Sequence, residues 1–245
     1  MGKLKGQTAI VTGASRGIGK AIAVMFASEG ANVVVTARTE YAIDDLAGRI
    51  VQSEGSALAV TADLSIDSDL QRIVDETLAN YGRIDILVNN AGIIHPRINL
   101  VDFDFELWRN VVAVNLEAVA LLTALCLPIM MQRNYGKVIN ISSIGGRKGS
   151  KGRSAYRATK AALINLTESV AAETKPYGID VNCICPGGVD TEGYREAFRM
   201  RGKIDDPSLM APEEIAKLAV YLASDDSSSV TGTAIDAFGG SNPLF

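Results

Sequence analysis

The sequence predicts an α/β protein, a single domain over residues 1–245 with a doubly wound parallel seven-stranded sheet and helices on both faces. Seven short apolar runs alternate with helical patterns, as expected where crossover helices join parallel strands. Glycine-rich or polar segments directly follow several of these runs, where open parallel sheets bind ligands. A chain of 245 residues with 47% hydrophobic content is also long enough to bury one large core.

The apolar runs place the expected strands at residues 8–11, 32–36, 57–61, 84–88, 137–141, 179–184 and 232–236. Helical patterns follow the first strand, over Lys20–Ser28, and the fifth strand, over 154–176. Because the polar interruptions at 89–92, 142–153 and 186–193 each follow a strand, we expect them to meet at one crevice along the carboxyl edge of the sheet.

A glycine turn joins the first strand to the first helix. Residues 12–19 read Thr-Gly-Ala-Ser-Arg-Gly-Ile-Gly. Such a turn lets backbone N–H groups approach a pyrophosphate, and the start of the helix adds a favourable dipole. The 4 and 2 residue spacing of Gly13, Gly17 and Gly19 differs from the commoner G-x-G-x-x-G pattern. On its own, the turn has a purely structural interpretation too.

A hydroxyl, a phenol and an ammonium lie at spacings suited to proton transfer. Ser143 precedes Tyr156 by thirteen residues, and Lys160 follows Tyr156 by four. On one helix, Tyr156 and Lys160 lie one turn apart on the same face. We therefore expect the ammonium to lower the pKa of the phenol. The alternative is that Tyr-x-x-x-Lys is a chance pair on an exposed helix.

The chain resembles the short-chain dehydrogenase/reductase family nearly from end to end. The ordered pieces that carry the resemblance are Thr12-Gly13-x-x-x-Gly17-x-Gly19, Asp63, Asn89-Asn90-Ala91-Gly92, Asn115, Ser143, Tyr156-x-x-x-Lys160, Pro186-Gly187 and Thr191. The resemblance implies a single NAD(P)-binding Rossmann domain that interconverts a carbonyl and a secondary alcohol by hydride transfer. It also implies that residues about 190–210 form a lid over the substrate.

The same resemblance assigns roles to individual residues. Tyr156 would donate the proton, Ser143 would hydrogen-bond the carbonyl oxygen, and Lys160 would hold the nicotinamide ribose. Asn115 would complete this catalytic tetrad through a water in the proton relay, or else is an ordinary helix-interior amide. The residues implied to bind the cofactor are Gly13, Ser15, Arg16, Gly17, Ile18, Gly19, Arg38, Asp63, Leu64, Asn90, Ala91, Gly92, Tyr156, Lys160, Pro186, Gly187, Val189 and Thr191.

The end of the second strand favours NADP, bound as NADPH, over NAD. NAD enzymes usually carry an acidic residue there for the ribose 2′-hydroxyl, whereas a 2′-phosphate needs positive charge. Ala37 occupies the family's acidic position, and Arg38 and Arg16 offer guanidinium groups suited to a phosphate. The alternative is that Arg38 only solvates a strand end. Asp63 either accepts from the adenine amino group or forms a plain turn before a helix.

The candidate substrate residues follow Ser143 or lie in the expected lid. A run of basic residues over 147–160 has no acidic residue to offset it, which indicates either a solvated loop or an anionic substrate or partner. The lid carries two aromatic residues one helical turn apart, and His95 and Arg97 follow the Asn-Asn-Ala-Gly turn, at the expected edge of the pocket. The residues assigned to the substrate are His95, Arg147, Arg153, Tyr194 and Phe198.

The overall pattern is similar to 3-oxoacyl-[acyl-carrier-protein] reductases, so a 3-oxoacyl thioester of acyl carrier protein or coenzyme A is the expected substrate. One departure is Lys175-Pro176 at the end of the catalytic helix, where those reductases often carry an arginine for the carrier protein. Reduction of a sugar, polyol, steroid or small ketone therefore stays open. A non-catalytic NADP sensor or scaffold is the alternative of another class.

Composition excludes several other functions. The formal charge of −4 offers no attraction to nucleic acid or an anionic membrane, and the apolar stretch 118–131 is too short to span a bilayer. The cysteines Cys126, Cys183 and Cys185 have no metal-like spacing, so we expect no metal site and a cytoplasmic location. The family resemblance implies a homotetramer formed through helices at 104–133 and 155–176.

Overall fold

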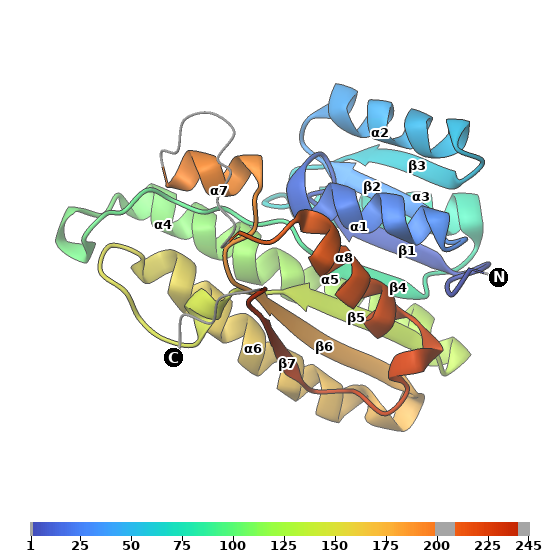
Figure 1. The fold of residues 1–245 in the computed structure, drawn as a ribbon. Coiled ribbons are helices and arrows are strands. Elements are labelled where there is room, and N and C mark those ends of the chain that lie inside the picture. Colours follow the sequence, from blue (N-terminus) through green and yellow to red (C-terminus); the bar gives the residue numbers. More distant parts are fainter. Residues whose placement is uncertain (1, 199–208, 240–245) are drawn as a thin grey trace.

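A computed structural model of the chain, which describes residues 2–198 and 209–239, confirms the predicted fold class. All seven strands pair in parallel, in the order β3-β2-β1-β4-β5-β6-β7 (Figure 1). The strands are β1 (Thr8–Thr12), β2 (Asn32–Ala37), β3 (Ser56–Thr61), β4 (Ile86–Asn89), β5 (Gly136–Ile141), β6 (Ile179–Pro186) and β7 (Ala234–Ala237).

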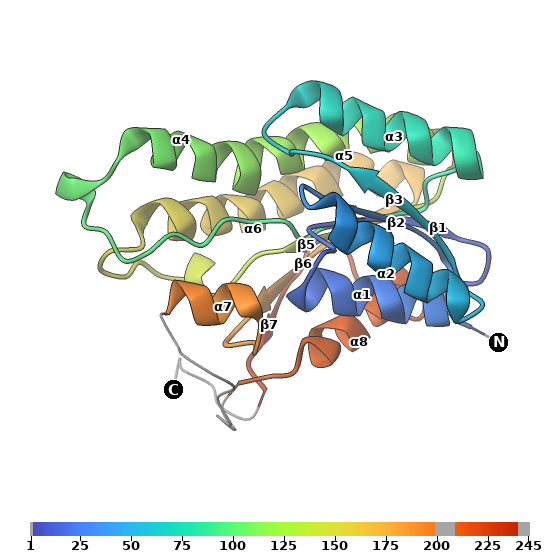
Figure 2. The same cartoon turned by 90° about the horizontal axis from the view of Figure 1, so that it is seen from above.

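Helices cover both faces of the sheet, as Figure 2 shows from above. In β1, Ala9 and Val11 point into one apolar cluster, and Ile10 points into the other, because successive residues of a strand face opposite sides. The first cluster includes side chains of α1 (Gly17–Ser28), α2 (Glu40–Gln52) and α8 (Pro212–Ala223), and the second includes side chains of α3 (Asp67–Tyr81), α5 (Ala118–Arg133) and α6 (Ser154–Thr174).

The helix expected at 104–133 has an internal irregularity. It consists of α4 (Phe105–Val112), a π-helical turn (Ala113–Glu117) and α5. The expected apolar stretch 118–131 is thus part of a continuous helical element of 29 residues, Phe105–Arg133. By length and composition alone this element is long enough to cross a membrane, which corrects the expectation that the stretch is too short. Leu122, Cys126 and Met130 pack it into the core beneath the sheet, as in a core helix of an α/β domain.

The predicted lid begins after β6 with α7 (Glu192–Ala197); its residues 199–208 lie outside the part that the structure describes. An isolated parallel bridge joins Val189 to Met210. The N–H of Asp190 donates to the Met210 carbonyl, and the N–H of Met210 donates to the Gly188 carbonyl, both at 2.9 Å. The two ends of the segment are thereby fixed to each other.

Candidate active site

The glycine turn between β1 and α1 has no room for a side chain at its glycine positions. Gly13 and Gly17 have φ values of +64° and +55°, a region that L-residues with a Cβ rarely adopt. A Cβ at Gly13 would lie 2.8 Å from the Cα of Ala91, and one at Gly19 would lie 2.4 Å from the carbonyl oxygen of Gly13. The turn therefore presents bare backbone at the start of α1, as a cradle for phosphate requires.

Asn90 fastens the loop after β4 to this glycine turn. Its Nδ2 donates to the carbonyl oxygens of Thr12, at 2.8 Å, and Gly13, at 3.2 Å. In return, the Thr12 hydroxyl accepts from the N–H groups of Asn90 and Ala91, each at 3.0 Å. The segments that follow β1 and β4 are thus joined, and together they form one wall of the site, which we call the cofactor wall. Sequence reasoning missed Thr12, although a buried threonine before a glycine turn is a polar group that needs a partner.

The loop after β6 reaches the same wall. A Cβ at Gly17 would lie 3.0 Å from the Thr191 Cγ2, and the Thr191 hydroxyl accepts from the Tyr194 N–H at the start of α7. The N–H of Gly187 donates to the Ala237 carbonyl at 2.7 Å. The predicted cofactor residues Ile18, Asn90, Gly92, Tyr156, Lys160, Pro186, Gly187, Val189 and Thr191 line one cavity here. A dinucleotide fits this cradle of bare backbone and loop ends.

The predicted adenosine end lies beyond the sheet's carboxyl edge. Arg38 is exposed directly after β2. The Asp63 carboxylate accepts from the Ser65 N–H and hydroxyl, at 3.0 and 2.7 Å. These hydrogen bonds, with a smaller contribution from the charge of Arg38, hold the pKa of Asp63 below its usual value. Leu64 packs against the core cluster beneath the sheet, and Ser15 is half-buried.

Arg16 is already paired. Its guanidinium donates to both carboxylate oxygens of Glu196 in α7, at 2.6 and 3.0 Å. The glycine turn and the start of the predicted lid are therefore joined by a two-point ion pair. Because both side chains are at least half exposed, this contact is of the weak surface kind.

Ser143, Tyr156 and Lys160 line the same cavity, which measures about 280 Å³. Ser143 follows β5 and accepts from the Gly145 N–H at 2.9 Å. Burial raises the pKa of Tyr156, while the hydrogen bond with Ser143 and the charges of Arg153 and Arg157 oppose that rise. The expectation that Lys160 lowers this pKa is corrected, because the shift is dominated by burial and its opposing charges come from the two arginines.

Lys160 is buried, and its Nζ donates to the carbonyl of Ile141, the last residue of β5, at 2.7 Å. Burial lowers the pKa of Lys160 from its usual 10.5 to about 8. The Nζ lies 5.9 Å from the centre of the Tyr156 ring. A Cβ at Gly92 would lie 3.4 Å from both this Nζ and the Asn115 Oδ1. The lysine is therefore held next to the tyrosine, with a glycine leaving access to it.

Asn115 lies in the π-helical turn and is fully buried. Its Oδ1 accepts from the Ile93 N–H at 2.7 Å, and its Nδ2 donates to the Ile93 carbonyl and to the Thr159 hydroxyl, at 3.1 and 3.3 Å. The side-chain amide thus pairs with the loop after β4 and with α6. Its Oδ1 accepts one hydrogen bond in the structure and has a second lone pair for the water of the predicted proton relay.

Three of the five predicted substrate residues, Arg153, Tyr194 and Phe198, line the cavity. His95 and Arg147 do not. Arg147 turns to β7, where its Nε donates to Asp236 at 2.9 Å. His95 is buried; its Nδ1 lies 2.6 Å from the Pro96 carbonyl, and its Nε2 accepts from the Tyr156 N–H. It therefore contacts the first turn of α6 and is not one of the residues that line the cavity.

The cavity also holds residues that were not assigned from the sequence. Arg157 belongs to the basic run, and its Nη1 donates to the carbonyls of Lys148 and Gly149, at 2.6 and 3.1 Å. The basic run over 147–160 was the feature of the sequence that could have indicated Arg157 as a cavity residue. Arg97, which was expected at the edge of the pocket, also lines the cavity, and the other lining residues are Ile94, Ile141, Ser142, Ile144, Gly145, Ser150 and Gly188.

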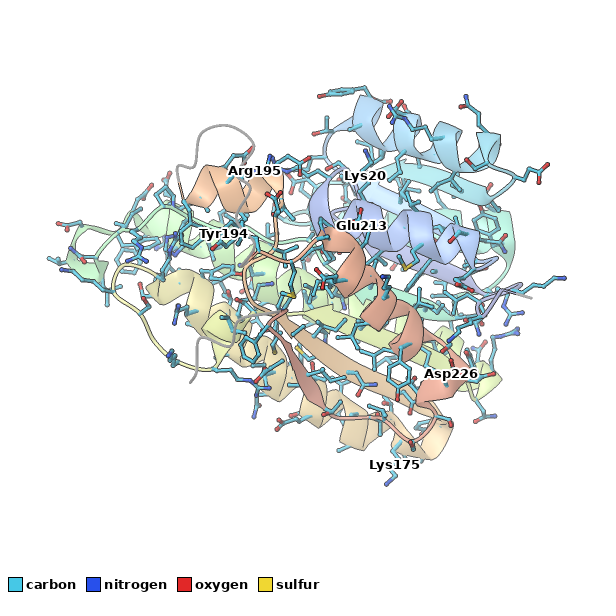
Figure 3. All side chains as sticks on the ribbon, in the orientation of Figure 1. Lys20, Lys175, Tyr194, Arg195, Glu213 and Asp226 are labelled. Atoms are coloured by element: carbon cyan, nitrogen blue, oxygen red, sulfur yellow. The ribbon has the colours of Figure 1, made fainter. Side chains whose placement is uncertain are left out.

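A second cavity, of about 430 Å³, lies between α1, α7 and α8. Lys20, Arg195 and Glu213 line it, and Figure 3 labels them together with Tyr194. Although this cavity is larger, it contains none of the four tetrad residues. Ser143, Tyr156 and Lys160 line the smaller cavity, so we place the chemistry there. Tyr194 and Arg195, although adjacent in α7, line different cavities.

Burial of the Lys160 ammonium predicts a pH-dependent stability. Between pH 8 and 10.5 the folded protein has released a proton that the unfolded chain retains, so its free energy of unfolding should rise with pH there. Lys160→Met should be the more stable protein near pH 7, and its advantage should shrink by up to about 3 kcal/mol towards pH 10.5. Urea unfolding of both proteins across this range measures the difference.

The matched control is Lys175→Met, at an exposed lysine of the same region of chain, which should give a difference from the parent protein that does not change with pH. A constant difference for Lys160→Met as well would contradict the assignment of a buried ammonium.

Comparisons with known proteins agree with this geometry. Residues 7–202 match the short chain dehydrogenase family model. The 3-oxoacyl-[acyl-carrier-protein] reductase of Escherichia coli is 37% identical, over 96% of this chain and 97% of that protein. Two solved structures have a TM-score of 0.89: a 3-ketoacyl-(acyl-carrier-protein) reductase from Brucella melitensis complexed with NADH, and a protein from Beutenbergia cavernae with bound NADP.

The Brucella protein is 32% identical, covering 97% of this chain and 98% of that one. The Beutenbergia protein is 36% identical and covers 97% of each. Family members with the same fold therefore use either nicotinamide cofactor. From the matched residues, the parallel sheet and the glycine cradle together, the chain belongs to the short-chain dehydrogenase/reductase family of oxidoreductases.

Proposed function

We propose that the protein is an NADP-dependent oxidoreductase that interconverts a ketone and a secondary alcohol, with Tyr156 as the general acid and base. The observation that carries the proposal is that Ser143, Tyr156 and Lys160 line one cavity with Ile18 of the glycine turn and with Asn90 and Gly92 of the loop after β4. A non-catalytic NADP sensor would need no such arrangement of proton-transfer groups beside the cradle.

The residues present can perform the proton half of the reaction. When bound, the nicotinamide supplies a hydride to the carbonyl carbon and is oxidised as the ketone is reduced. The Tyr156 phenol donates its proton to the carbonyl oxygen, which takes the electron pair of the broken π bond. Ser143 hydrogen-bonds that oxygen as its negative charge grows. Burial keeps the phenol protonated at neutral pH, as a proton donor in the reducing direction must be.

The choice of NADP rests on charge at the end of β2. Exposed Arg38 follows Ala37, so this strand end offers a cation and no carboxylate at the family's acidic position. Arg16 can add a second guanidinium to a 2′-phosphate only by giving up Glu196. Arg38 is therefore the residue that we assign to the phosphate.

A 3-oxoacyl thioester is the substrate that we would test first, because the Escherichia coli and Brucella relatives carry that activity in their names. We further propose a homotetramer that works in the cytoplasm. Side chains of α5 that remain partly exposed, such as Leu121, Leu125 and Leu127, support a helical interface, and the three buried free cysteines suit a reducing compartment.

Replacing the proposed acid should abolish most turnover without disturbing the cofactor. Tyr156→Phe should lower kcat for ketone reduction by roughly 10²- to 10⁴-fold, the usual contribution of a general acid, while NADPH affinity measured by fluorescence titration stays unchanged. Tyr177→Phe, at an exposed tyrosine beyond the end of α6, is the control. Full turnover by Tyr156→Phe would end the proposed mechanism.

Removing the charge at the end of β2 should change cofactor preference. Arg38→Ala should weaken NADPH binding by roughly 10- to 100-fold, as expected for the loss of hydrogen bonds to a charged group, and leave NADH binding unchanged. Arg49→Ala, at an exposed arginine of α2 paired with Asp45, controls for general charge. Tighter binding of NADH than of NADPH by the unaltered protein would overturn the assignment.

A further inference from the structure

The cavity that holds Tyr156 has a one-sided charge. Its lining includes three arginines, Arg97, Arg153 and Arg157, as well as Lys160, and among the described residues that line it there is no aspartate or glutamate. A cavity of about 280 Å³ with cations on its wall and no carboxylate to balance them favours an anionic ligand.

Arg153 is the most enclosed of these arginines, with 4% of its surface exposed. It caps the start of α6, and its guanidinium donates to the carbonyl of His95 and, at 3.2 Å, to the carbonyl of Ala197. The guanidinium carbon lies 4.8 Å from the centre of the Phe198 ring. The group is therefore fixed between α6, α7 and the loop after β4.

The buried guanidinium of Arg153 has no anionic partner among the residues that the structure describes. Within residues 2–198 and 209–239, no carboxylate forms an ion pair with Arg153. Burial and the neighbouring charges of Arg97 and Arg157 lower its pKa, which marks an unbalanced cluster. Other arginines within these described residues do pair with carboxylates: Arg16, Arg49, Arg72, Arg83, Arg133, Arg147 and Arg195.

Arg153 precedes Tyr156 by three residues across the first turn of α6. Both side chains line the same cavity of about 280 Å³, so a small molecule can contact both at once. A guanidinium also uses up to five N–H donors and matches a carboxylate or phosphate at two points. A charged group that lies within a few bonds of the ketone would reach Arg153 while the ketone oxygen meets Tyr156.

Resting on the function proposed above, we propose that Arg153 binds an anionic group carried by the ketone or alcohol substrate. The short distance along α6 favours the carboxylate of a small oxo or hydroxy acid. A phosphate on the pantetheine arm of a thioester has the same chemistry but is separated from the reacting carbon by many bonds.

The test compares charged and uncharged forms of one ketone. The first pair is acetoacetate and methyl acetoacetate; the second is acetoacetyl-coenzyme A and the acetoacetyl thioester of N-acetylcysteamine. Each is assayed with NADPH and the parent protein, Arg153→Met and Arg109→Met. Arg109 is exposed on α4 and lies outside the cavity lining. Acetoacetate binding in the presence of NADP⁺ is measured separately by calorimetry.

We expect Arg153→Met to lower kcat/KM for acetoacetate by roughly 10- to 100-fold, with little change for the methyl ester, and to abolish calorimetric binding of acetoacetate. A selective loss for acetoacetyl-coenzyme A over its uncharged counterpart would support the anion site and name phosphate as its source. Arg109→Met should resemble the parent protein throughout.

Equal losses for charged and uncharged substrates would overturn the proposal and leave Arg153 a structural link between α6 and α7. If the variant does not fold, the parent protein still decides: it must favour the charged member of at least one pair by tenfold or more. Turnover without any charge preference would overturn the anion site but keep the proposed function. Acetoacetate binding that depends on Arg153, without turnover of any ketone, would support the anion site but overturn the proposed function.

Discussion

The contact between the glycine turn and the loop after β4 is the constraint on which the site depends. Parallel pairing of β1 with β4 brings these two loops to the same edge, and the amide of Asn90 then ties them together through the Thr12 and Gly13 carbonyls. No Cβ fits at Gly13 or Gly19 because the loops approach so closely. The cofactor wall is therefore set by backbone packing more than by any reactive side chain.

The same packing continues into the proton-transfer groups. The loop after β4 leads to Ile93, whose backbone holds the Asn115 amide in the π-helical turn. Asn115 also contacts Thr159, the neighbour of Lys160 in α6, and Lys160 is held by the last carbonyl of β5. The loop after β4, the end of β5 and α6 thus locate one buried ammonium. Burial has opposite effects on the two neighbouring groups: it raises the pKa of Tyr156 and lowers that of Lys160.

Local patterns in the sequence were enough to predict a seven-stranded parallel sheet, because alternating apolar runs and helical patterns depend on nearby residues, and the ordered motifs from Thr12 to Thr191 indicated the family. The order of the strands within the sheet was not predicted. The strand bounds differ by only a few residues, with β7 beginning at Ala234. Long-range contacts were not predictable in this way. The contact of His95 with the Tyr156 N–H, the hydrogen bond of Arg147 to Asp236 and the pairing of Arg16 with Glu196 all join segments that are far apart in the chain.

We propose that one crevice holds the cofactor's nicotinamide against a ketone beside Tyr156. This is tested by reducing a ketone that the enzyme turns over with NADPH that carries deuterium at the transferable position of nicotinamide C4, and by analysing the product by mass spectrometry and NMR. We expect each product molecule to gain a single deuterium at the carbinol carbon. A product that takes this hydrogen from the solvent would contradict direct transfer within the crevice.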